Sequence, residues 1–120
     1  MRKDIEQTQW TNYLAEYTRR NRGRPTRLEV IGGVDGDDFW LECGLPLTGI
    51  DTDTHGKDAP LVEIMLGGRS AQESDKHVTR SIARVRRVTP ETSEDGRDQG
   101  LEIEDSESVT TILRFETLEI

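Results

Sequence analysis

The sequence predicts a small α+β domain, in which an N-terminal amphipathic helix packs on a strongly bent antiparallel sheet or small barrel of about six strands. Three observations predict it. Apolar residues near the start recur at helical spacing, later ones alternate with polar residues, and most connections are short enough for antiparallel hairpins. At 120 residues we expect one domain, 1–120, with the helix over about 4–20 and the β-rich body over about 27–119.

The helix is predicted over residues 4–20. One apolar stripe recurs at positions i, i+3, i+4 and i+7: Trp10, Tyr13, Leu14 and Tyr17. Asp4 and Gln7 have the spacing of a capping box, and Gly23 followed by Pro25 should end the helix. We expect the stripe to pack against the core.

Six apolar stretches predict the strands: residues 27–31, 38–50, 61–66, 78–88, 101–103 and 111–115. Pro46 inside the second stretch predicts an edge position or a bulge, so we expect that strand to bend. In the third stretch, Val62, Ile64 and Leu66 should face inward.

The sequence of the fourth stretch, 78–88, is compatible with either a helix or a strand. Val78, Ile82 and Val85 have helical spacing, whereas the β-branched content favours a strand. We interpret it as a bulged strand. Turns are predicted at the glycine-rich residues 32–36, within 89–100 at an Asp-Gly pair, and at the acidic residues 104–108.

The charge is strongly acidic and poor in lysine. The chain has 24 acidic and 16 basic residues, and 13 of the basic residues are arginine. Carboxylates keep a surface hydrated when salt screens their repulsion, so we hypothesise a salt-adapted protein. A lone cysteine, Cys43, fits a reducing cytoplasm, where we expect the protein. No stretch is long enough for a membrane span, and Asp4 follows Arg2 and Lys3 too soon for a signal peptide.

Basic residues concentrate near the start, where residues 1–27 carry +4 and the remainder carries −12. Residues 22–25 read R-G-R-P, the core of a minor-groove DNA-binding hook. A nucleic-acid-binding small barrel would use two arginine clusters: Arg20, Arg22, Arg24, Arg27, Arg84, Arg86 and Arg87. The competing interpretation is that these arginines pair with acidic neighbours inside the domain.

An acidic loop follows the second strand. Asp51, Asp53, His55 and Asp58 are the candidate ligands of a weak metal or enzymatic site. A calcium-binding loop starting at Asp51 needs a carboxylate at its twelfth position, which here is the apolar Val62. The spacing therefore favours a hairpin connection, in which aspartates cap turn amides and a glycine, Gly56, adopts positive φ.

The other chemistry-bearing residues form no recognisable motif. His55 and His77 lack zinc-ligand spacing and should be exposed, and Cys43 alternates with Phe39 and Leu41 as a buried, inert thiol. Phosphate-binding glycine loops and serine-nucleophile motifs are missing from the sequence. We therefore predict no cofactor, and the sequence favours a non-enzymatic role.

Several motifs occur in a fixed order: W-x-x-Y-L, L-P-L-x-G-I-D, V-E-I-x-L-G, H-V-T-R-x-I and T-I-L-R-F. From Trp10 to Phe115 this order resembles a family of small, mostly bacterial proteins catalogued as a domain of unknown function. The resemblance implies no activity, cofactor or catalytic residue. The family carries H-x-I-x-x-P near its fourth strand, whereas here Arg80 stands at the histidine position and the proline is missing.

Three functional hypotheses follow, in descending order. The first is a protein-interaction or accessory domain, binding an unknown protein partner or a second copy through exposed strand edges and the loop 67–76. The second is nucleic-acid binding through the arginine clusters, and the third is the metal or enzymatic site in the acidic loop. A membrane partner is not expected.

Overall fold

The computed structural model describes residues 3–32, 38–67 and 77–116, with the backbone alone for 38–43. It confirms the α+β class with one N-terminal α-helix. The elements, in chain order, are η1 (Gln7–Gln9), α1 (Trp10–Asn21), β1 (Pro25–Ile31), β2 (Asp38–Asp53), β3 (Leu61–Gly67), β4 (His77–Ile82), β5 (Val85–Thr92), β6 (Asp98–Asp105) and β7 (Thr110–Phe115).

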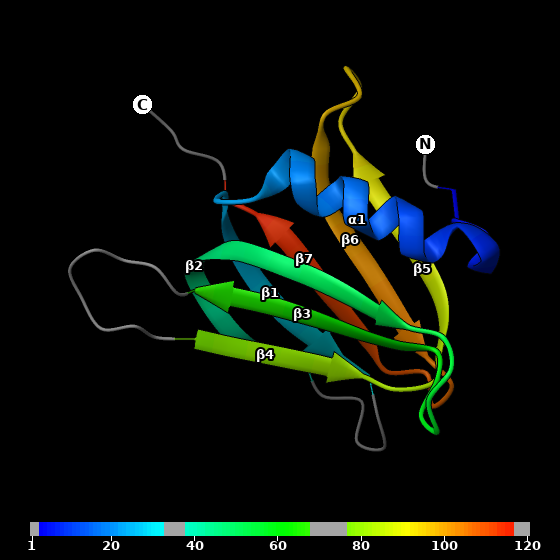
Figure 1. Cartoon of the computed structure of the whole chain (residues 1–120). Helices are drawn as coiled ribbons and strands as arrows, with labels where there is room; N and C mark the ends of the chain where they lie inside the picture. The colour runs from blue at the N-terminus through cyan, green and yellow to red at the C-terminus, as the bar shows by residue number, and fades with distance from the viewer. Residues whose placement is uncertain (1–2, 33–37, 68–76, 117–120) are drawn as a thin grey trace, which may run out of the picture.

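The strands form one antiparallel sheet in the order β4-β3-β2-β1-β7-β6-β5. The start of β2 pairs with β1, whereas its end pairs with β3, and the register shifts near Pro46 as β2 leaves β1. The predicted bend is confirmed. It brings β3 and β4 in front of β1, β7 and β6 (Figure 1), and we call these the front and rear layers.

The core lies between the two layers and under α1. Trp10, Leu14 and Tyr17 of the helical stripe are buried, and Tyr13 is half-buried. From the sheet come mainly aliphatic side chains: Leu28, Leu47, Val62, Ile64, Leu66, Ile82, Val88, Leu101, Ile103 and Leu113. Each fully buried side chain of this size contributes about 1.5–3 kcal/mol of transfer free energy, so the layers and α1 hold each other in place.

Over the residues that the structure describes there are seven strands, not about six, and they form an open sheet that does not close into a barrel. The extra strand arises because residues 78–88 do not form one bulged strand. The chain turns a corner at Arg84, whose φ is +50°, and this corner separates β4 from β5. The Arg84 amide donates to the Asp58 carbonyl and the Val85 amide to the Pro60 carbonyl, which satisfies the backbone at the corner.

The helix begins later than predicted, and the capping box at Asp4 and Gln7 is wrong. Neither η1 nor α1 has a side-chain N-cap. The Asp4 carboxylate accepts from the Thr89 hydroxyl, and the Ile5 amide donates to the Val88 carbonyl. The N-terminal segment therefore runs along β5 before the helix starts.

Several predictions lie outside the described residues. These are most of the turn at 32–36, most of the loop 67–76, and the side chain of Cys43. Among the helices described, none is long and apolar enough to cross a membrane.

Candidate functional site

The candidate metal ligands of the acidic loop do not converge. Asp53 accepts hydrogen bonds from the His55 amide (2.9 Å) and the Gly56 amide (3.2 Å), and these bonds lower the pKa of its carboxyl. Asp58 instead pairs with Arg84 at 3.2 Å. Asp51 lies opposite Glu63 on β3. Each of the first two carboxylates thus has a local partner, which is the arrangement of a capped hairpin connection.

Gly56 does not have the positive φ that the sequence predicted. A Cβ at this position would lie 3.0 Å from Oδ2 of Asp53, so glycine leaves room for the capping carboxylate. Across the described ranges, no group of three His, Cys, Asp or Glu side chains could hold a metal ion. His55 and His77 are both exposed, His55 in the β2–β3 connection and His77 at the start of β4.

The first arginine cluster holds the end of α1 against the sheet. Arg20 donates to both carboxylate oxygens of Asp98, at 2.9 and 3.2 Å, and Asn21 donates to the same carboxylate at 2.8 Å. Arg24 donates to the Asn21 side chain and to the Asp98 carbonyl, and its guanidinium lies 4.1 Å from the ring centre of Phe115. These two arginines are therefore structural ties, while Arg22 and Arg27 are exposed.

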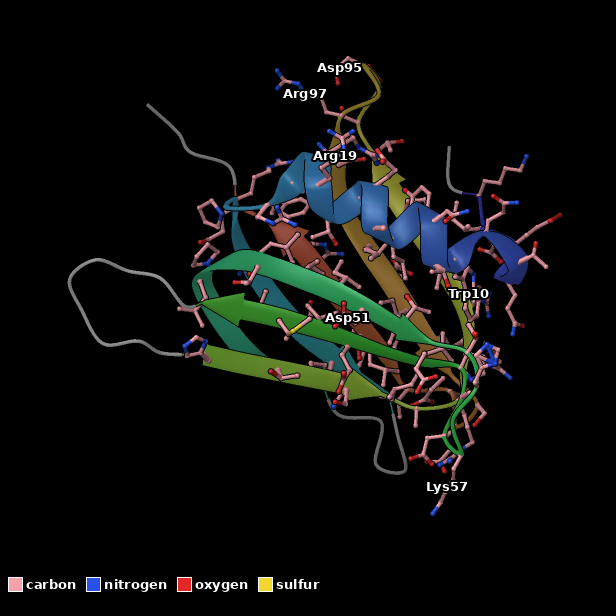
Figure 2. All side chains as sticks on the ribbon, in the orientation of Figure 1. Trp10, Arg19, Asp51, Lys57, Asp95 and Arg97 are labelled. Carbon is pink, nitrogen blue, oxygen red and sulfur yellow. The ribbon has the colours of Figure 1, made fainter. Side chains whose placement is uncertain are left out.

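The second cluster is also paired with acidic residues. Arg86 and Arg87 both bind the Glu104 carboxylate across the β5–β6 ladder, and Arg84 binds Asp58. The pairing with acidic neighbours that the sequence offered as the competing interpretation is thus observed at Arg20, Arg84, Arg86 and Arg87. Figure 2 shows the two polar turns near Lys57 and near Asp95 and Arg97 at opposite ends of the molecule.

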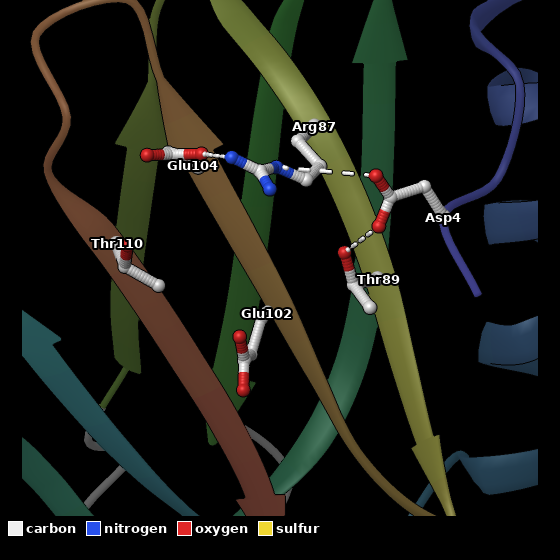
Figure 3. A pocket seen from close by; sticks show the side chains of 6 residues that line it. All are labelled: Asp4, Arg87, Thr89, Glu102, Glu104 and Thr110. Carbon is white, nitrogen blue, oxygen red and sulfur yellow. Dashed lines mark hydrogen bonds and ion pairs between the residues drawn. The ribbon is translucent and has the colours of Figure 1, made fainter. Parts of the chain in front are cut away.

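A polar cavity that the sequence did not predict lies on the outer face of the rear layer (Figure 3). It has a volume of about 380 Å³ and is lined by Asp4, Arg87, Thr89, Glu102, Glu104 and Thr110. Its charges already have partners: Asp4 accepts from Thr89, Arg87 bridges Asp4 and Glu104, and Glu102 is not free either. We interpret the cavity as the place where the N-terminal segment is tied to β5.

The two ends of the sheet differ sharply. At one end, β5 contains Pro90 and two register shifts, and the N-terminal segment covers it through the Ile5 amide. At the other end, all six residues of β4 pair with β3 without a register shift. No backbone hydrogen bond from the described residues reaches the other side of β4. Within the described part of the chain, this side of β4 is a free strand edge.

One charged side chain of β4 points inward. Arg80 lies opposite the buried Ile64 in the ladder, and its Nε donates to the hydroxyl of Thr111 on β7, at 3.2 Å. Desolvation lowers the pKa of Arg80, and only the charge of Asp105 works against this effect. Within the described ranges, Arg80 makes no ion pair with a carboxylate. A guanidinium on the inner face of a free edge is the unusual feature of this structure.

The chain matches no family model, no curated protein and no solved structure. The resemblance based on the motifs therefore stays a prediction. The sequence contained one feature compatible with this edge, namely that residues 77–82 carry no acidic side chain in a chain with 24 acidic residues. It did not indicate where the edge would lie, because the corner at Arg84 was not predicted.

Proposed function

We propose that this domain is a non-enzymatic protein-binding module that accepts an extended segment of its partner along the free edge of β4. The observation that carries the proposal is the contrast between the two ends of the sheet. Native proteins protect edge strands with proline, bulges or covering segments. The β5 edge has all three protections, whereas β4 is regular and uncovered within the described part of the chain.

The charge around β4 supports an acidic partner. β4 contains His77 and Arg80 but no carboxylate, whereas the whole chain has a net charge of −8. The neighbouring Glu63 of β3 accepts a hydrogen bond from the Ser81 hydroxyl on the exposed face of β4. An acidic segment added along this edge would meet a strand that has no carboxylate of its own, and Arg80 would attract it. Strand addition would supply main-chain hydrogen bonds for affinity, and the alternating side chains would supply specificity.

The proposal is tested by blocking the edge with proline. Successive residues of an edge strand direct their amides alternately toward the neighbouring strand and away from it. Of the substitutions Val78→Pro and Thr79→Pro, one therefore falls on the free side and keeps the fold, as circular dichroism will show. Peptides selected from a displayed random library on the unmodified chain should lose about tenfold or more in affinity for that variant.

A matched control is Thr92→Pro, which places proline in a strand end remote from β4. The library peptides should bind this variant as they bind the unmodified chain. Equal binding to the blocked β4 variant, or a library without any specific binder, contradicts the proposal.

The two other hypotheses gain no support from the contacts. Most of the candidate nucleic-acid arginines described here already bind partners within the domain, and the candidate metal ligands do not converge. Both hypotheses stay predictions, and neither has an observation that favours it over strand addition.

A further inference from the structure

We infer that the partner segment carries a carboxylate opposite Arg80, flanked two residues away on each side by apolar residues. This inference rests on the proposed use of the β4 edge and deepens it, because it names the side-chain chemistry of the partner. It starts from the alternation of side chains along β4. Val78, Arg80 and Ile82 share the inward face, whereas His77, Thr79 and Ser81 are exposed.

Arg80 has hydrogen-bonding capacity to spare. Its Nε donates to the Thr111 hydroxyl, and Thr111 is fully buried in the rear layer. A guanidinium has five N–H donors in a planar fork, and a carboxylate fits this fork with two parallel hydrogen bonds. No carboxylate of the described residues occupies this fork.

An added strand would place one of its side chains beside the guanidinium of Arg80. Residues that lie opposite each other in a ladder project to the same face, with Cβ atoms about 4.5–5.5 Å apart. An Asp or Glu opposite Arg80 would therefore lie within reach of its guanidinium. Since the strand would shield this pair from water on one more side, the attraction would be stronger than that of an exposed pair.

The flanking positions require apolar side chains. The partner residues two positions before and after the acid would lie opposite Val78 and Ile82, in either strand direction. Ile82 is 2% exposed, and Val78 packs against the core cluster. The partner motif is thus apolar-x-acidic-x-apolar in an extended segment.

The same chemistry argues against a symmetric dimer through β4. A second copy that added its own β4 would bring no carboxylate in any register, because residues 77–82 contain none. Two desolvated guanidinium groups would then share one interface in which neither β4 strand supplies a carboxylate, which is costly. The occupant that fits is a segment of a different protein with an acidic residue.

The test uses three synthetic peptides of alternating valine and threonine with a solubilising polyethylene-glycol tail. They differ only at the central inward position, which is Glu, Gln or Lys. Each is titrated into isotope-labelled protein, and the amide resonances of residues 77–82 locate the binding. We expect the Glu peptide to bind about tenfold more tightly than the Gln peptide, with the Lys peptide weakest.

Arg80→Gln should abolish the preference for Glu over Gln, and Arg80→Lys should keep part of it. The matched control is Arg84→Gln, which removes a nearby exposed arginine and should leave the preference unchanged. The peptide series on the unmodified chain decides the question even if an Arg80 variant does not fold.

The outcomes separate the inference from the proposed function. If the Glu and Gln peptides bind at β4 with equal affinity, the carboxylate requirement is overturned while strand addition at β4 stands. If none of the peptides changes the β4 resonances, or the Glu peptide binds elsewhere, the proposed function itself is overturned.

Discussion

At the scale of single residues, Asp98 shows how a charged group can tie one element to another. Burial alone raises the pKa of Asp98, but hydrogen bonds from Arg20 and Asn21 and the charges of Arg20 and Arg24 outweigh it. The pKa therefore lies below its ordinary value of 3.8. The ionised carboxylate thus stabilises the folded chain at neutral pH, and this contribution is lost as the pH falls through the folded-state pKa.

Asp98→Asn should lower the free energy of unfolding at pH 7 by about 1–3 kcal/mol, because Arg20 loses its counter-charge. The stability difference between the variant and the unmodified chain should shrink as the pH falls below about 4. Urea unfolding across this pH range measures it. Glu94→Gln, an exposed neighbour, is the control, and an equal effect of both substitutions would speak against the tie.

Tyr17 differs from Asp98 in that its polar group is buried without a partner among the described residues. Its ring is fully buried and stacks on Phe115 at 6.1 Å between ring centres, but its hydroxyl has no hydrogen-bond partner among the described residues. Burial raises the pKa of this phenol, so the group stays protonated.

Tyr17→Phe removes the unsatisfied hydroxyl and keeps the ring, so we expect unchanged or higher stability, by up to about 1 kcal/mol. Tyr17→Leu removes the ring stacking and should cost about 1–3 kcal/mol. Thermal unfolding of both variants checks this order. A clear loss of stability in Tyr17→Phe would mean that the hydroxyl has a partner.

The sequence predicted that aspartates of the acidic loop cap turn amides, because an aspartate in a turn bonds the amides that follow it, but it did not single out Asp53. It did not predict the conformation of Gly56, because the same pattern suits a positive φ and a close approach of a side chain. It could not predict the tie between Arg20 and Asp98 either, since their contact depends on how α1 crosses the sheet.

At the scale of elements, the corner between β4 and β5 determines the architecture. The apolar pattern of residues 78–88 identified extended structure correctly, but a corner needs only one residue in the left-handed region. Arg84 carries no glycine signal for it. The predicted start of the helix at residue 4 was wrong for a similar reason. The contact of Asp4 with Thr89 joins segments distant in the sequence and overrides the local capping pattern.

Substitutions at Arg84 test the corner. Because φ is +50° there, a β-branched residue is strained, and Arg84→Val should cost about 1–2 kcal/mol. Arg84→Asn should cost less, since asparagine adopts this conformation more readily. The ion pair between Arg84 and Asp58 that this substitution removes is exposed and weak. Denaturant unfolding gives the order. Equal stability of the Val and Asn variants contradicts the strained corner.

At the scale of the whole molecule, the class and the single helix followed from periodicity, and the bend of β2 followed from Pro46. Closure could not be predicted, because it depends on whether β4 and β5 meet. In the structure β4 and β5 do not pair with each other. The N-terminal segment covers β5, and no backbone hydrogen bond from the described residues reaches the other side of β4.

The net charge of −8 leads to a prediction about salt. Screening weakens the mutual repulsion of carboxylates, so the melting temperature should rise by several degrees between dilute and molar KCl. Differential scanning calorimetry across a KCl series measures it. A flat or falling curve contradicts the proposed salt adaptation.

The central claim is that β4 is a free edge that a partner strand can occupy. Amide hydrogen exchange of residues 77–82, measured with and without a bound library peptide, tests it most directly. The account predicts that alternate β4 amides exchange rapidly in the free chain and become protected in the complex. Uniform protection of β4 in the free chain, or no change in its exchange upon binding, would contradict it.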